Sequence, residues 1–180
     1  MAHLVVLLAD GFEEVEAITV IDLLRRAGVT VTTAGVRMAE VPGGHGITVV
    51  ADTTLKHLPD SFDGIVLPGG GKGTQVLAAS EAVIDLVKKS FADGLLCAAI
   101  CAAPSVFGKA GILRNMRATC YPGFEDQLIG ARFIEAAVVR DKNIITGRGV
   151  TAAIPFALEL IAQTAGASTA ERIAGDVLYS

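Results

Sequence analysis

Cys101 has the surroundings expected of a reactive thiol. It lies in Ala98-Ala99-Ile100-Cys101-Ala102-Ala103-Pro104, where an apolar run meets a proline that suits the first turn of a helix. A tight strand-to-helix turn around a nucleophile requires small residues two positions away, and Ala99 and Ala103 meet that need. Helix N-terminal amides would then favour the thiolate. The segment predicts a nucleophile elbow; the alternative is a small buried side chain in an ordinary turn.

A glycine-rich turn could supply the second part of such a site. Pro68-Gly69-Gly70-Gly71 follows another apolar run. Because its three glycines have no side chains, their backbone amides are unshielded. Such a turn can bind an oxyanion together with the amide that follows a nucleophile, so Gly70 and Ala102 are the predicted pair. The alternatives are a purely structural turn and a phosphate-binding loop, whose usual Lys-Ser/Thr ending is absent.

Four carboxylates, Asp10, Glu13, Glu14 and Glu16, surround the start of the first predicted helix. Most are expected to be solvated and to favour the helix N-terminus through the helix dipole. One that faces the sheet could be desolvated, stay protonated and donate a hydrogen bond to the Cys101 thiolate. Spacing alone leaves Glu13, Glu14 and Glu16 as candidates for this role.

The histidines are poorly placed for a catalytic Cys-His pair. His3 precedes the first predicted strand, and His45 and His57 lie in a glycine-containing region between two core strands. None follows a core strand near Cys101, which argues against a cysteine protease or amidase. His45 is interpreted as a loop residue rather than a base.

The elements that must position these residues alternate between strand and helix. Apolar runs predict buried strands, and apolar residues at helical spacing predict the helices between them. The predicted strands cover 3–8, 29–34, 63–67 and 95–100, with a hairpin or edge excursion within 42–58 and a hairpin within 138–146. The predicted helices cover 15–27, 82–91, 102–109 and 151–165, followed by one capped by Ser168. This order predicts a flavodoxin-like, doubly wound α/β fold: a mostly parallel sheet between helices, with ligands beyond the carboxyl ends of its strands.

Composition restricts the classes of protein. The 180 residues are 52% hydrophobic with a net charge of −4, which predicts one packed domain over residues 1–180. Neither a bilayer-spanning run of roughly 20 apolar residues nor a signal peptide is expected, so no membrane partner is predicted. The lack of a basic cluster argues against nucleic acid. Three cysteines without paired-ligand spacing predict free thiols in a reducing, cytoplasmic compartment and no metal site.

Four stretches together resemble the ThiJ/PfpI superfamily and are most similar to the branch of the Parkinsonism-associated protein deglycase, also described as glyoxalase III. They are residues 9–16, 67–70, 99–104 and 146–149, in order and across most of the chain. The resemblance implies a class I glutamine amidotransferase-like domain with Cys101 as the reactive residue. It implies that Glu16 hydrogen-bonds the cysteine sulfur and that the Gly70 and Ala102 amides bind the oxyanion. It also implies a homodimer with the first helix at the interface.

The sequence departs from that branch at Tyr121, within Thr119-Cys120-Tyr121-Pro122, where a histidine is often found. This departure weighs against a catalytic triad and leaves the source of proton transfer undefined. Cys120, Tyr121 and Arg148 are further candidates to line the pocket.

The leading hypothesis is a cofactor-free enzyme that acts on methylglyoxal or glyoxal, free or as early adducts on proteins. The Cys101 thiolate would attack the aldehyde, Glu16 would move a proton between carbons, and the two amides would stabilise the oxyanion. The alternative is an oxidative-stress sensor or redox-regulated chaperone, in which Cys101 is oxidised to sulfinate.

Overall fold

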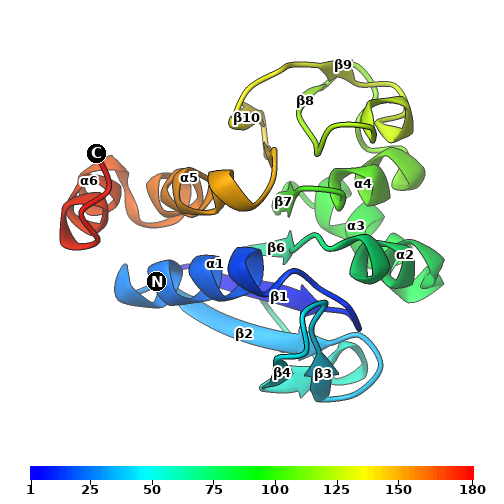
Figure 1. Cartoon of the computed structure of the whole chain (residues 1–180), viewed down its shortest axis with the longest axis horizontal. Helices are drawn as coiled ribbons and strands as arrows, with labels where there is room; N and C mark the ends of the chain where they lie inside the picture. The colour runs from blue at the N-terminus through cyan, green and yellow to red at the C-terminus, as the bar shows by residue number, and fades with distance from the viewer.

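A seven-stranded sheet lies between two layers of helices in the computed structural model, which describes all 180 residues (Figure 1). The strand order is β10-β11-β7-β6-β1-β2-β5, and every neighbouring pair is parallel except β10 and β11. The strands are β1 (His3–Leu8), β2 (Thr30–Gly35), β5 (Thr53–Thr54), β6 (Gly64–Leu67), β7 (Leu96–Ile100), β10 (Val138–Asp141) and β11 (Ile144–Gly147). The predicted mostly parallel α/β sheet is confirmed.

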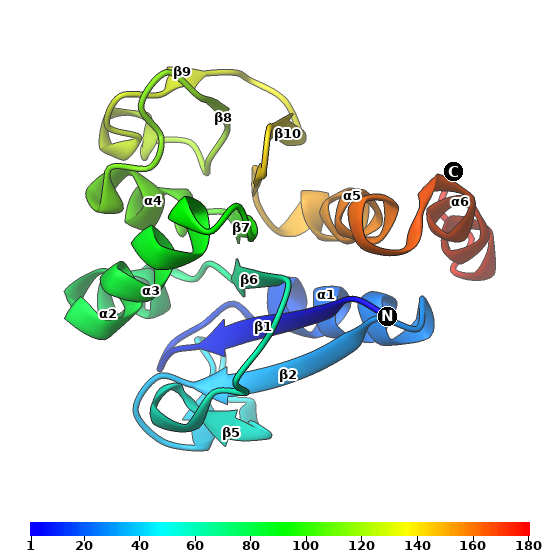
Figure 2. The ribbon, with the colours of Figure 1, turned by 180° about the vertical axis from the view of Figure 1, so that it is seen from behind.

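The helices divide between the two faces of the sheet. On one face lie α1 (Glu14–Arg26) and α5 (Ala153–Ala165), and α6 (Ala167–Asp176) extends this layer (Figure 1). On the other lie α2 (Gly71–Ala79), α3 (Glu81–Ala92) and α4 (Pro104–Ala110), as the view from behind also shows (Figure 2). No helix combines the length and the apolar character needed to cross a membrane.

Two hydrophobic cores explain the continuous apolar runs of the sequence. Successive side chains of a strand point to opposite faces of its sheet. Leu4 and Val6 of β1 therefore enter the core beneath α1 and α5, whereas Val5 and Leu7 enter the core beneath α3 and α4. All four side chains are fully buried. A strand covered on both faces needs apolar residues at every position.

Shorter elements lie outside the main sheet. The hairpin of β3 (Glu40–Pro42) and β4 (Thr48–Val50) follows β2 and begins two residues before the predicted region 42–58. A parallel pair, β8 (Arg117–Ala118) and β9 (Arg132–Phe133), forms between α4 and β10. Three 3-10 helices complete the chain: η1 (Leu55–His57), η2 (Glu125–Gln127) and η3 (Val150–Ala152).

Three local predictions need correction. Helix α4 begins at Pro104, not at residue 102, because the residues after β7 form a turn. Ser168 does not cap α6: the helix begins at Ala167 after Gly166, whose φ of 93° ends the preceding helix. Helix α2 was not predicted, because two glycines near its start lower its intrinsic helix propensity.

Candidate active site

Cys101 occupies a strained turn at the carboxyl end of β7. Its φ is 65°, a left-handed conformation that costs a side-chain-bearing residue about 1–2 kcal/mol. Backbone hydrogen bonds hold the turn from both sides: the Cys101 amide donates to the Gly147 carbonyl at 2.9 Å, and the Tyr121 amide donates to the Cys101 carbonyl at 2.8 Å. The neighbours Ala99 and Ala103 are fully buried, as the predicted turn requires of its small residues.

The three segments expected at this edge of the sheet do meet there. Gly69, after β6, lies so close to the other two that a Cβ on it would be 2.5 Å from Cys101 Cβ and 2.6 Å from Glu16 Oε2. The Glu13 amide also donates to the Gly69 carbonyl at 3.0 Å. A glycine is therefore required where the segments after β1, β6 and β7 converge.

Glu16 is the carboxylate that faces this site. It lies in the first turn of α1 and is fully buried, and its Oε2 atom accepts a hydrogen bond from the Gly69 amide at 2.9 Å. The buried Oε1 atom has no partner of regular hydrogen-bond geometry. Burial raises the pKa of Glu16 to about 7, although its interactions with the Cys101 side chain and the Gly69 amide oppose that rise. Near neutral pH the carboxyl can therefore both donate and accept a proton.

The Cys101 sulfur experiences opposing influences. Burial and the negative charge of Glu16 raise the pKa of the thiol to about 12, while hydrogen bonds from the Gly70 and Ala102 amides lower it. The expected preference for thiolate at the helix N-terminus is thus outweighed, first by burial, which acts in either protonation state of Glu16, and second by the charge of Glu16. When Glu16 carries the proton, the repulsion ends and both amides still stabilise the negative sulfur.

The other predicted pocket residues lie around this centre in different ways. The half-exposed ring of Tyr121 packs over Gly149, where a Cβ would be 3.3 Å from the ring. Arg148 pairs with Glu135 at 3.0 Å. Cys120 is fully buried, and burial raises its pKa to about 11 with Arg148 acting in the opposite direction. Of these residues, Tyr121 is the one whose backbone bonds directly to Cys101.

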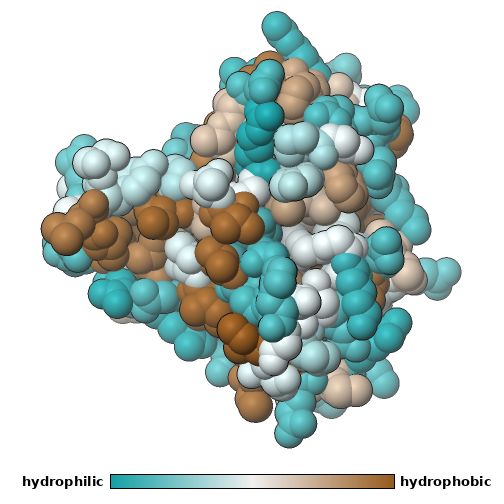
Figure 3. Space-filling view, in the orientation of Figure 1, coloured by the Kyte–Doolittle hydropathy of each residue, from teal (hydrophilic) through white to brown (hydrophobic).

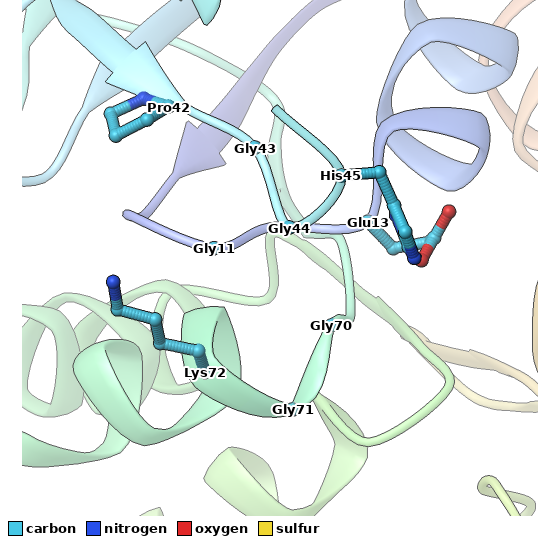
Figure 4. A pocket seen from close by; sticks show the side chains of 9 residues that line it. All are labelled: Gly11, Glu13, Pro42, Gly43, Gly44, His45, Gly70, Gly71 and Lys72. Carbon is cyan, nitrogen blue, oxygen red and sulfur yellow. The ribbon is translucent and has the colours of Figure 1, made fainter. Parts of the chain in front are cut away.

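A polar pocket of about 320 Å³ lies beside the glycine turn (Figure 4). It is lined by Gly11, Glu13, Pro42, Gly43, Gly44, His45, Gly70, Gly71 and Lys72, with no hydrophobic side chain. Gly70 belongs both to this pocket and to the surroundings of the sulfur. Sequence reasoning did not assign His45 to the pocket, because nothing near it in the chain indicates its neighbours.

Glu13, Glu14 and His45 form the group whose side-chain types could hold a metal ion. Their ligand atoms lie within 4.8 Å of one another. His45 Nδ1 is 2.9 Å from Glu14 Oε2 and 3.5 Å from Glu13 Oε2. Contacts between a histidine and two carboxylates account for this arrangement without an ion.

Comparison with known proteins shows the family of this chain. The model of the DJ-1/PfpI family matches residues 2–163. The chain belongs to the DJ-1/PfpI family. It is 39% identical to the protein dj-1beta of Drosophila melanogaster over 179 residues, which cover 97% of this chain and 96% of the fly protein. It is 36% identical to a protein named deglycase in Pyrococcus abyssi, covering 81% of this chain and 89% of that protein.

Family members differ in length, and one of them has been solved in an oxidized form. The chain spans 40% and 45% of DJ-1 homologues B and A of Arabidopsis thaliana, to each of which it is 41% identical. Among solved structures, oxidized DJ-1 of Toxoplasma gondii superimposes with a TM-score of 0.96 at 36% identity and covers all of both chains. The mostly parallel sheet between helices is therefore a property that this chain shares with DJ-1 structures.

Proposed function

We propose that this member of the DJ-1/PfpI family is a cysteine-dependent, cofactor-free glyoxalase III or deglycase. Its substrates would be methylglyoxal, glyoxal or their early adducts on amines and thiols. The observation that carries the proposal is the strained turn at Cys101, where Gly69 lies in close approach to both Cys101 Cβ and the buried Glu16 carboxyl. The deglycase names of archaeal relatives support the same reaction class.

The reaction with methylglyoxal begins with addition of the Cys101 thiolate to the aldehyde carbon. A carbon–sulfur bond forms and the carbonyl electrons move to oxygen, where the Gly70 and Ala102 amides stabilise the oxyanion. Protonation of that oxygen gives a hemithioacetal. A proton then moves from the former aldehyde carbon to the neighbouring carbon, and the hydroxyl proton moves from the oxygen of the first carbon to the oxygen of the second. Together these two shifts convert the hemithioacetal into a lactoyl thioester. Water cleaves the thioester and releases lactate and the thiol, so methylglyoxal and water give lactate and a proton.

Glu16 is the group we assign to the proton transfers. A carboxyl with a pKa of about 7 is divided between its acid and base forms at neutral pH, which suits both removal and return of a proton. This assignment offers an answer to the missing histidine at Tyr121, because one carboxyl beside the sulfur can serve both directions of transfer.

The test is turnover of methylglyoxal by the purified chain, measured as lactate formed. Cys101→Ala should abolish turnover, whereas Cys97→Ala, which removes a buried thiol of the preceding strand β7, should retain it. Wild-type turnover no faster than buffer, or turnover that survives Cys101→Ala, would refute the proposal.

A second candidate function is oxidative-stress sensing, also compatible with a redox-regulated chaperone. The oxidized state of the Toxoplasma relative favours it. Peroxide would transfer one oxygen to the Cys101 thiolate and leave as water, and a second peroxide would convert the resulting sulfenate to sulfinate. A protonated Glu16 and the two amides could hydrogen-bond the sulfinate oxygens. In both functions the three free cysteines suit a reducing, cytoplasmic compartment.

We further propose a homodimer formed through α1. Val15 and Ile18 lie one turn apart on this helix and are 49% and 44% exposed. Hydrophobic surface gathers over α1 and α5 on the face shown in Figure 3. Large apolar side chains on a surface helix indicate a protein contact.

A further inference from the structure

Glu14 is a buried carboxylate that the proposed chemistry does not use. It begins α1, and its side chain is only 6% exposed. Its oxygens accept hydrogen bonds from the His45 amide at 2.6 Å, from His45 Nδ1 at 2.9 Å and from the Ile47 amide at 3.4 Å. All three donors belong to the turn between β3 and β4, so Glu14 anchors that turn to the start of α1.

The anchored turn is bonded directly to the segment that follows β1. The Gly11 amide donates to the Pro42 carbonyl at 2.8 Å, and the Gly44 amide donates to the Phe12 carbonyl at 2.8 Å. Gly43 fits between these segments because it has no side chain: a Cβ there would overlap the Glu14 carboxyl. The turn and the segment therefore have little freedom to move independently.

The segment after β1 is in turn bonded to the glycine turn after β6. The Glu13 amide donates to the Gly69 carbonyl at 3.0 Å, and the Gly73 amide donates to the Gly11 carbonyl at 3.1 Å. A Cβ on Gly70 would overlap the Gly11 carbonyl oxygen and lie 2.7 Å from the Glu13 amide nitrogen. The backbone of residues 11–13, which is in direct contact with Gly70, therefore sets the position of Gly70.

We propose that Glu14 and His45 are a positioning pair for the Gly70 amide that faces the Cys101 sulfur. Their hydrogen bonds fix the β3–β4 turn, the turn fixes residues 11–13, and those residues fix Gly69 and Gly70. Neither side chain needs to touch substrate. The inference rests on the proposed reactivity of Cys101, because the Gly70 amide would act by stabilising the negative charge of the Cys101 sulfur.

Both charge states of His45 can maintain the pair. The hydrogen bond to Glu14 and the charges of Glu13 and Glu14 raise the pKa of His45. A neutral imidazole with its proton on Nδ1 still donates to Glu14. The pair is therefore expected to hold Gly70 on both sides of that titration, which distinguishes positioning from a proton relay through His45.

The test compares three histidine variants by the rate at which iodoacetamide alkylates Cys101, followed against pH by peptide mass. His45→Ala removes the side-chain donor, His45→Asn keeps a donor near the position of Nδ1, and His57→Ala removes an exposed histidine that bonds only locally to Thr54. His45→Ala should slow alkylation about tenfold at neutral pH by displacing an amide from a charged sulfur. His45→Asn should restore most of the rate, and His57→Ala should match the wild type.

Two outcomes would overturn the inference: an unchanged alkylation profile in His45→Ala, or equal losses in His45→Ala and His45→Asn. Thermal unfolding of each variant shows that the compared chains are folded, and the exposed position of His45 makes that the expected result. The assay requires no aldehyde substrate. Absence of lactate formation together with the expected alkylation pattern would therefore refute the proposed enzyme and leave the positioning pair intact.

Discussion

The Gly69 amide and the Glu16 carboxylate, 53 positions apart in the sequence, meet in a buried hydrogen bond of 2.9 Å. This bond joins the loop after β6 to the first turn of α1 directly beside Cys101. It uses one carboxylate oxygen and leaves the other without a regular partner, so the protonation of Glu16 is tied to the state of the sulfur.

Glu16 should make stability depend on pH in an unusual direction for an acid. Because burial raises its folded pKa from 4.5 to about 7, its contribution to stability is fully present below pH 4.5 and is lost as pH rises through 7. The free energy of unfolding should fall by about 3 kcal/mol over this range of pH. Urea unfolding at pH 4.5 and pH 8 should show this loss in the wild type, and Glu16→Gln should lack it.

The matched control for that measurement is Glu171→Gln, because Glu171 is exposed on α6. It should show the same dependence on pH as the wild type. Equal pH dependence in the wild type and Glu16→Gln would mean that the carboxyl has an ordinary pKa.

Gly70→Ala should destabilise the fold and disturb the thiol. The φ of Gly70 is 91°, and an added Cβ would meet backbone atoms of the segment after β1. We expect a loss of about 2 kcal/mol or more in the free energy of unfolding and slower alkylation of Cys101. Gly71→Ala is the matched variant, since a Cβ there meets nothing within 4 Å, and its stability should equal or exceed that of the wild type. Equal effects of the two substitutions would contradict the close packing at Gly70.

Mild peroxide should oxidise one cysteine. Cys97 and Cys120 are fully buried, whereas Cys101 is partly exposed and the amides of Gly70 and Ala102 act to lower the pKa of its thiol. Intact mass should rise by two oxygens, and peptide mapping should place both on Cys101. Cys101→Ala should gain none under the same conditions. Oxidation spread over all three cysteines would argue against a sensor.

The proposed dimer should depend on α1. Light scattering of the eluting protein should give twice the chain mass of 18.5 kDa, and Ile18→Glu should give the single-chain mass. A charge buried at an interface without a partner opposes association. Ile129→Glu changes a residue that is 62% exposed near β9 and should remain dimeric. A wild-type chain that elutes as a monomer would exclude the interface.

The order of strands and helices could be read from the sequence, because strands buried on both faces need continuous apolar residues. The small residues around Cys101 likewise predicted a tight turn, because such a turn needs small side chains at neighbouring positions in the chain. Helix α2 escaped prediction: its glycines weaken local propensity, whereas the helix forms with Leu77 buried in the core beneath α3 and α4.

Only the tertiary structure separated the roles of the clustered carboxylates. Glu14 and Glu16 are two residues apart, and on a helix this spacing turns side chains by about 200°. One therefore faces His45 and the other faces Cys101. The proposal that Cys101 is the reactive thiol rests on local information, carried by its neighbours in the chain. The sequence did not show that the pKa of the Cys101 thiol is raised, or that Gly70 and Glu16 lie beside it. Burial and charge depend on segments that are distant in sequence and meet only when the sheet has formed.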